Sequence, residues 1–313
     1  MEVPLPRLPR ERLKILTDAD TGADDAVSIL LGCALADVLA ISCTDGNVPA
    51  AVATDNTLRL LEAAGFAADS DAIVAQGLTW PTSQGRHWGR DFNDIFPTAP
   101  ARVVSRSPAH EVLVETALKQ EGELLTLVCT GPLQNVGEAL RHAEKLGQLE
   151  AFVSRFSKVV IMGGLCNPHS WDGQLPNHAE FNIRACVDDC RDVWAAPWPD
   201  TVEFVLVPLD PIARTPLLWA DVRRVEVLAQ SGTARRAAAC WSVLDKHVRQ
   251  DEAMLKSRGL EVYDAFAMAV ALDPAVAQRE AHAEVSQLPH SEPSSSLSGR
   301  SNRDGNREYH HEM

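Results

Sequence analysis

Short runs of apolar, β-favouring residues alternate with longer segments of helical periodicity along most of the chain. This alternation predicts an α/β fold with an open, mainly parallel sheet flanked by helices. After Pro216 the pattern is helical, so we expect a helical C-terminal part. The expected strands are Leu13–Thr17, Val38–Thr44, Ala72–Ala75, Leu124–Cys129, Lys158–Gly163 and Val202–Val207. The expected helices are Asp24–Leu35, Ala50–Ala64, Ala109–Gln120, Leu133–Lys145, Asp188–Ala196, Leu217–Ala229, Thr233–Arg249 and Asp264–Leu272.

The composition changes at both ends of this pattern. Residues 1–12 hold three prolines and three arginines and lack the apolar stretch of a secretory signal, so we expect an N-terminal arm. Residues 286–313 are rich in Ser, Pro and charged side chains and bury too little apolar area to offset the entropy of ordering, which predicts a disordered tail. One domain is expected over residues 13–285.

Charge and cysteine content narrow the class of protein. The chain has 29 Lys and Arg against 43 Asp and Glu, a formal net charge of −14, which disfavours nucleic acid as a partner. No apolar run approaches the roughly 20 residues that cross a bilayer, so no membrane is expected. Seven cysteines, an odd number, favour reduced thiols and a cytoplasmic protein.

The loop after the first expected strand carries the strongest chemical signal. Residues 17–26 read TDADTGADDA, with four carboxylates at Asp18, Asp20, Asp24 and Asp25. Such groups repel one another unless a cation or hydrogen-bond donors compensate them. A helix N-terminus explains one or two of them, but not four. Carboxylate oxygens without a nearby His or Cys favour Ca²⁺ or Mg²⁺ as the cation.

Two general motifs compete for this loop. An EF-hand needs Gly at its sixth position and Glu at its twelfth, whereas here Gly22 is fifth after Asp18 and a helix begins too soon. A haloacid-dehalogenase-type phosphatase would use Asp18 or Asp20 as nucleophile, but it leaves the Asp24 and Asp25 pair without a role. Both interpretations fit only part of the loop.

The same loop, DxDxGxDDA over residues 18–26, resembles the inosine/uridine-preferring nucleoside hydrolases, which are nucleoside N-ribohydrolases. The resemblance covers about residues 14–283 and implies a nucleoside hydrolase-like fold. Further segments match in the same order: GNV at 46–48, NTLRLLEAAG at 56–65, TGPLQN at 130–135, MGG at 162–164, AEFN at 179–182, and YDA at 263–265 where the family has a His-Asp pair opening a helix.

The resemblance implies an enzyme that uses Ca²⁺ to convert a ribonucleoside and water into ribose and a free base. Its metal ligands would be Asp20, Asp25, Asp264 and the main-chain carbonyl of Thr130. Catalytic positions would be Asp20, which accepts a proton from the water, Asn47 and Tyr263. The substrate-binding positions would be Asp24, Asn47, Met162, Gln174, Asn177, Glu180, Asn182 and, in the first long loop, His87.

Three features depart from the family pattern. Gly173-Gln174 stands where the family has a Gly-Asn pair, so a ribose contact passes to Gln174 or to Asn177. Residues 87–94 read HWGRDFND and lack glycines of the family's loop. Tyr263 replaces the histidine often assigned as acid to the leaving base. A free Tyr titrates near ~10 and a His near ~6.5, so we expect poor protonation of the base at neutral pH.

Three hypotheses follow for the function. The first is a Ca²⁺-dependent nucleoside hydrolase of purine or pyrimidine salvage, and the second is a catalytically weak or inactive ribonucleoside-binding homologue. The third is the phosphatase. Under the first two, the partner is a small ribonucleoside, and the family implies a dimer or tetramer. His110 and His142 lie in expected helices, and the pattern assigns them no partner.

Overall fold

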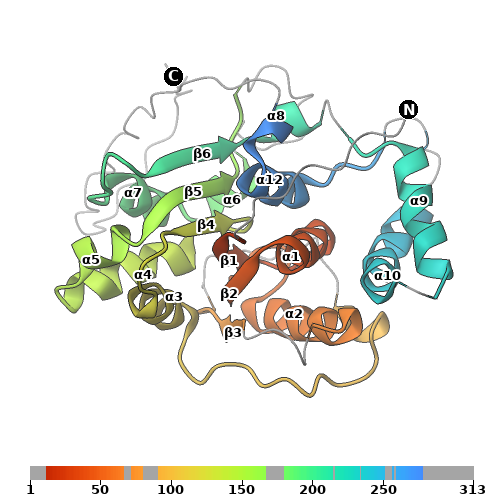
Figure 1. Ribbon diagram of the computed structural model, residues 1–313, viewed down its shortest axis with the longest axis horizontal. Helices are drawn as coiled ribbons and strands as arrows, with labels where there is room; N and C mark the ends of the chain where they lie inside the picture. Colours follow the sequence, from red (N-terminus) through yellow and green to blue (C-terminus); the bar gives the residue numbers. More distant parts are fainter. Residues whose placement is uncertain are drawn as a thin grey trace, which may run out of the picture. The chain divides into compact units, whose positions relative to one another are not determined.

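The computed structural model describes residues 12–66, 72–79, 91–166, 180–213, 216–232, 234–250, 256 and 259–277 (Figure 1). Its centre is a six-stranded parallel sheet with the strand order β3-β2-β1-β4-β5-β6. Every expected strand is present, with boundaries within two residues of the prediction. The strands are β1 Lys14–Ala19, β2 Asp37–Cys43, β3 Ile73–Gln76, β4 Leu125–Cys129, β5 Phe156–Met162 and β6 Glu203–Val207.

The long helices also lie where the apolar periodicity places them. Three short helices, α5, α6 and α8, were not predicted, because four or five residues are too few to show a helical period. The helices are α1 Ala23–Leu35, α2 Ala50–Ala64, α3 Ala109–Lys119, α4 Gln134–Lys145, α5 Leu149–Val153, α6 Phe181–Ala185, α7 Val187–Ala195, α8 Leu209–Ile212, α9 Trp219–Gln230, α10 Arg235–Gln250 and α12 Tyr263–Leu272, with 3₁₀ turns η1 Phe92–Asp94 and η4 Pro274–Val276.

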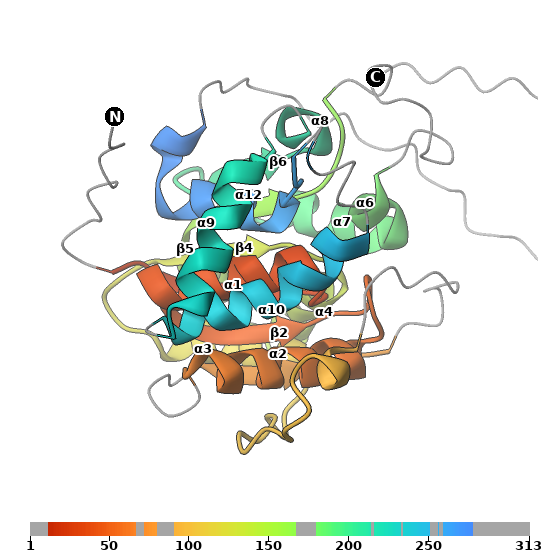
Figure 2. The same ribbon diagram turned by 90° about the vertical axis from the view of Figure 1, so that its right-hand side faces the viewer.

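Helices cover both faces of the sheet. Helices α3, α4 and α7 pack on one face, and α1, α2 and α12 pack on the other (Figure 1). Helices α9 and α10 pack on each other and lie outside α1 and α2, as Figure 2 shows. Because both faces are covered, a central strand such as β4 is buried at all five positions, which explains its continuous apolar sequence.

The strand order reverses between β1 and β4. From β1 the chain builds outward through β2 and β3, and then returns to add β4, β5 and β6 on the other side of β1. Where the order reverses, the segments that follow neighbouring strands separate toward opposite faces, and a crevice opens at the carboxyl ends. The Asp-rich loop follows β1, and the TGPLQN segment follows β4.

The chain divides into residues 1–276, which hold every element given above, and residues 277–313. No helix in the described part of the chain is long and apolar enough to cross a membrane. The expected disordered tail, and the expected arm except for Arg12, lie outside the described residues.

Candidate active site

The candidate site begins with the loop that joins β1 to α1. The N–H of Gly22 donates to Asp25 Oδ2 at 2.8 Å and closes the first turn of α1. Thr21 has a φ of 24°, a conformation that is strained for a β-branched residue. Two buried contacts with α2 hold it: Thr21 Oγ1 lies 2.7 Å from Thr57 Oγ1, and its carbonyl accepts from Asn56 Nδ2 at 3.1 Å. Helix α2 therefore fixes the conformation of the loop.

Asp18 is buried inside the sheet. Its Oδ1 accepts hydrogen bonds from Ser42 Oγ in β2 and, at 2.9 Å, from Asn135 Nδ2 in α4. Burial raises the pKa of Asp18 to about 7. Asp18 Oδ1 is engaged by two neighbouring side chains, and Asp18 is not part of the group formed by Asp24, Asp25 and Asp264. This arrangement counts against the phosphatase hypothesis with Asp18 as the nucleophile, and it reveals Ser42 and Asn135 as supports that the sequence did not predict.

The turn after β2 holds Asp20. The backbone N–H of Asn47 donates to Asp20 Oδ2, and Asn47 Nδ2 donates to Asp20 Oδ1 at 3.2 Å. Gly46 makes this close approach possible, because a Cβ at that position would lie 2.1 Å from Asp20 Oδ2. Asn47 thus fixes the orientation of the Asp20 carboxyl group.

Asp25 links α1 to the segment after β4. Its Oδ1 accepts from Thr130 Oγ1 at 2.7 Å, and its Oδ2 accepts from Asn47 Nδ2 at 3.3 Å. Asp25 also shares a hydrogen bond with Asp20, which requires a proton on one of the two carboxyl groups. The ends of three neighbouring strands therefore meet at Asp25.

Asp24 and Asp264 form a second carboxyl pair. Asp264 lies in the first turn of α12, which packs against α1, and it shares a hydrogen bond with Asp24. One oxygen atom from each of Asp24, Asp25 and Asp264 lies within 4.8 Å of the other two. The fold therefore brings together residues from opposite ends of the described chain.

The electrostatics of these four carboxyl groups fit a divalent cation. Burial, followed by the charge of Asp25, raises the pKa of Asp24 to about 6. Burial and neighbouring carboxylates also raise the pKa values of Asp20 and Asp264 well above their ordinary range. No Lys or Arg is among the largest causes of these shifts. A cation bound by oxygen atoms would replace the shared protons, and the oxygen-only donor set suits Ca²⁺ or Mg²⁺.

A second group of predicted site residues surrounds the N-terminus of α6. The carboxylate of Glu180 accepts from the backbone N–H groups of Asn182, Ile183 and Gly164 at 2.9, 3.0 and 3.2 Å. Burial nevertheless raises the pKa of Glu180. Glu180 and Asn182 are both buried rather than solvated.

Asn182 connects this group to the end of β4. Its Nδ2 donates to the carbonyl of Thr130 at 2.9 Å and to the carbonyl of Met162 at 3.2 Å. The carbonyl that the resemblance assigns to the metal is therefore already oriented by a buried side chain. Four predicted site residues, Thr130, Met162, Glu180 and Asn182, form one hydrogen-bonded cluster with the backbone after β5.

Tyr263 is the first residue of α12 and is only partly buried. Its hydroxyl donates to the carboxylate of Glu261. Burial and the charge of Glu261 raise the pKa of Tyr263 above its ordinary value of 10. The phenol is therefore a weaker acid than free tyrosine. The predicted substrate residues His87, Gln174 and Asn177 lie outside the described residues.

Comparisons with known proteins agree with this arrangement. The model of the family "Inosine-uridine preferring nucleoside hydrolase" matches residues 15–306. The chain is 29% identical over 279 residues to the inosine-uridine preferring nucleoside hydrolase of Leishmania major, a match that spans 85% of this chain and 81% of the relative. The protein of the same name from Crithidia fasciculata is 26% identical over 276 residues, with the same coverage of 85% and 81%.

Solved structures show the same fold. An inosine-guanosine nucleoside hydrolase superposes with a TM-score of 0.69 at 24% sequence identity, over 84% of this chain and 80% of that chain. A plant nucleoside hydrolase superposes with a TM-score of 0.65 at 23% identity and equal coverage. These likenesses confirm the predicted fold class.

Proposed function

The chain belongs to the inosine-uridine preferring nucleoside hydrolase family, and on this premise we propose that it is a Ca²⁺-dependent ribonucleoside hydrolase that releases ribose and a free base. The N-glycosidic reaction itself follows from the family. The observation that carries the metal dependence is the cluster of four carboxyl groups that, without a cation, pair through shared protons at the point where the strand order reverses. Hard oxygen ligands without imidazole or thiolate suit Ca²⁺ or Mg²⁺, and the family resemblance favours Ca²⁺.

We assign the ion to the carboxylates of Asp20, Asp25 and Asp264 and to the main-chain carbonyl of Thr130. The convergence of Asp25 and Asp264 within 4.8 Å supports this assignment, and so does the hydrogen bond between Asp20 and Asp25. When bound, Ca²⁺ supplies positive charge that orients the ribose hydroxyl groups and the attacking water. Asp24 also lies within this group of oxygens, and we retain it as a ribose ligand that closes the site on the α1 side.

In the reaction, Asp20 accepts the proton of a water molecule whose oxygen attacks C1′ of the ribose. As the C1′–O bond forms, the C1′–N bond breaks, and its electron pair leaves with the base. Asn47 contributes by holding the Asp20 carboxylate through both its backbone and its side-chain amide. A general base such as Asp20, whose orientation is fixed in advance, loses less conformational freedom in the transition state.

Ribose recognition falls to Asp24, Asn47, Glu180 and Asn182, with Met162 against the sugar. Support comes from the burial of Glu180 and Asn182 and from their hydrogen bonds to the ends of β4 and β5. Such fixed polar groups discriminate strongly, because a sugar that lacks a hydroxyl leaves one of them unpaired in a buried site. Gln174, Asn177 and His87 complete the predicted substrate set.

Protonation of the leaving base is the weakest step of this proposal. Tyr263 binds Glu261 through its hydroxyl, and its pKa is raised, so it donates a proton poorly at neutral pH. This same observation favours the alternative function, a ribonucleoside-binding homologue with low turnover.

One assay separates these functions. Release of reducing sugar from inosine, uridine and nitrophenyl riboside is measured with EDTA and after addition of Ca²⁺. A hydrolase releases ribose only with the cation. Binding of inosine without release of ribose supports the binding homologue, whereas phosphate release from phosphomonoesters supports a phosphatase. Substitution of Mg²⁺ for Ca²⁺ tests the identity of the ion.

We further propose a cytoplasmic enzyme of purine or pyrimidine salvage that forms a dimer or tetramer. All seven cysteines are free, as expected in a reducing compartment. Sedimentation of the full chain measures the subunit number.

A further inference from the structure

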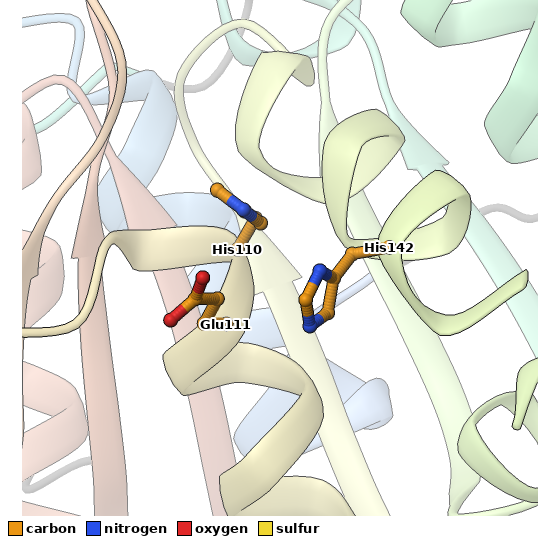
Figure 3. A group of neighbouring side chains, drawn as sticks. All are labelled: His110, Glu111 and His142. Atoms are coloured by element: carbon orange, nitrogen blue, oxygen red, sulfur yellow. The ribbon is translucent and has the colours of Figure 1, made fainter. Parts of the chain in front are cut away.

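A second cluster of potential metal ligands lies between α3 and α4. Figure 3 shows His110 and Glu111, neighbours in the first turn of α3, and His142, which faces them from the last turn of α4. The two imidazole rings meet edge to face, with centroids 5.3 Å apart. One ligand atom from each of the three side chains lies within 4.8 Å of the other two.

This cluster is separate from the carboxylate site. Helices α3 and α4 cover the face of the sheet opposite to α1 and α12 (Figure 1). His142 lies about two turns, or about 12 Å along the axis, beyond the first residue of α4. No residue of the carboxylate site takes part in the cluster.

The ligand atoms of the cluster are available. In the described part of the chain, neither ring is engaged in a hydrogen bond or an ion pair, and the carboxylate of Glu111 is in no ion pair. Burial, assisted by His142, lowers the pKa of His110, so that ring is neutral and carries a lone pair at neutral pH. A metal ligand needs this neutral form.

The surrounding charges are largely balanced. Glu138, which acts on His110 from α4, is paired with Arg141 at 2.9 Å and with Lys145 at 3.6 Å. The negative end of the α4 dipole favours a cation beside His142, and the positive end of the α3 dipole opposes it to a similar extent. The carboxylate of Glu111 adds a negative charge beside the two imidazole rings.

We propose that His110, Glu111 and His142 form a binding site for a first-row divalent transition metal ion of the Zn²⁺ class, with the fourth position open to water. Two imidazoles and one carboxylate suit such an ion, whereas they suit Ca²⁺ poorly. Tetrahedral bonds of about 2.0–2.1 Å place ligand atoms about 3.3 Å apart, so the three side chains need only small rotations. All three are partly exposed, which leaves room for those rotations.

Occupancy of this site joins α3 to α4. The two helices already pack against each other, and an ion that binds only the folded protein raises its stability by mass action. Its ligand set differs in chemistry from the all-oxygen carboxylate site at the carboxyl ends of the strands.

The test is a calorimetric Zn²⁺ titration of the full-length, metal-stripped chain in excess Ca²⁺. We expect one Zn²⁺ per chain, and a visible absorption spectrum of nitrogen-ligated character when Co²⁺ replaces it. His110→Ala and His142→Ala should each weaken binding at least about 100-fold, since even an outer-shell partner of a metal costs 10- to 100-fold. Glu111→Gln should weaken it as well.

Control variants test whether the Zn²⁺ ion binds at His110, Glu111 and His142 rather than elsewhere on the chain. Glu115→Gln removes a carboxylate one turn along α3, where it pairs with Lys119, and should leave Zn²⁺ affinity unchanged. Asp25→Asn and the tail variant His310→Ala/His311→Ala should also retain the ion. Circular dichroism confirms that each variant is folded. Three results would overturn the proposal. They are absence of Zn²⁺ binding by the wild type, wild-type Zn²⁺ affinity in both single histidine variants, and loss of binding only in the tail or Asp25 variant.

Discussion

The two halves of the candidate active site are built differently. On the sugar side, Asp20, Asp25 and Asp264 are buried, and Asp20 and Asp25 accept hydrogen bonds from Asn47 and Thr130 in the segments after β2 and β4. On the leaving-base side, Tyr263 is partly exposed, and its hydroxyl is engaged by Glu261. With the roles proposed above, the described residues are arranged to bind ribose and to activate water. They include no comparably fixed group that would protonate the leaving base.

The largest effect is expected from Asp20→Asn. In the proposed mechanism Asp20 accepts the proton of the attacking water, so its loss should lower kcat about 10²- to 10⁴-fold, the usual contribution of a general base. The reduction should be equal for inosine and for nitrophenyl riboside, since both need the same water. Stopped and continuous assays of the two substrates measure it. A loss confined to inosine would place Asp20 on the leaving-base side and break the comparison.

The ribose hydroxyl groups test the sugar side from the substrate. We expect 2′-deoxyinosine to have a kcat/KM at least about 100-fold below that of inosine, because each unpaired buried polar group costs about 1–3 kcal/mol. Asn182→Ala should reduce the ratio of kcat/KM for inosine to that for 2′-deoxyinosine. It removes one of the buried polar groups and the hydrogen bonds to the carbonyls of Thr130 and Met162. Equal binding of inosine and 2′-deoxyinosine in calorimetry would contradict the ribose assignment.

Stability as a function of pH tests the carboxyl pairs. The folded state raises the pKa of Asp24 from 3.8 to about 6 and that of Asp18 to about 7, so it binds more protons than the unfolded state over this range. In the metal-free protein, the stability that these two groups contribute should therefore be fully present below about pH 4 and be lost as the pH rises to about 6 and 7. Thermal unfolding in EDTA at several pH values measures this trend.

Ca²⁺ should reverse that trend, because it binds the ionised carboxyl groups. At pH 7.5, Ca²⁺ at about 100 times its Kd adds about 2.7 kcal/mol, or about 4–5 °C in Tm for a domain of this size. Asp25→Ala should abolish this increase, whereas Glu115→Gln on α3 should retain it. An unchanged Tm of the wild type with saturating Ca²⁺ would argue against the metal site.

The smallest effect is expected from Tyr263→Phe. Since the phenol is a poor acid, its removal should lower inosine turnover by less than about threefold and leave nitrophenyl riboside turnover unchanged, because nitrophenolate leaves without a proton. Tyr263→His should raise the inosine rate if its ring reaches the base. A large loss of inosine turnover in Tyr263→Phe alone would identify the phenol as the acid and remove the difference between the two halves.

The fold was predictable because its signals are local and repeated. Runs such as LTLVC in β4 are buried on both faces, and amphipathic segments such as α4 show a clear helical period. The short helix α6 has neither signal. It exists because the Glu180 side chain caps its N-terminus and also accepts from the backbone of Gly164, a tertiary contact that five residues do not reveal.

The sequence predicted which residues form the site better than it predicted the hydrogen bonds between them. The loop of residues 18–25 showed the acidic cluster directly, and Asp264 came from its place in a family motif. Asp18 is held by Ser42 and Asn135, and the sequence did not predict these two contacts. A short polar side chain at either position could have faced either way. The meeting of His110 with His142 depends on how α3 is staggered along α4, and no sequence period determines that offset.

The order of the strands also has a consequence for folding kinetics. The carboxylate site needs the segments after β1 and β4 and finally α12, so its parts meet only after the long connections between parallel strands have closed. Contacts of such large sequence separation form slowly and late. An ion bound by Asp20 and Asp264 together therefore has no site in the early stages of folding, and it lengthens the lifetime of the native state by slowing unfolding while the refolding rate stays the same.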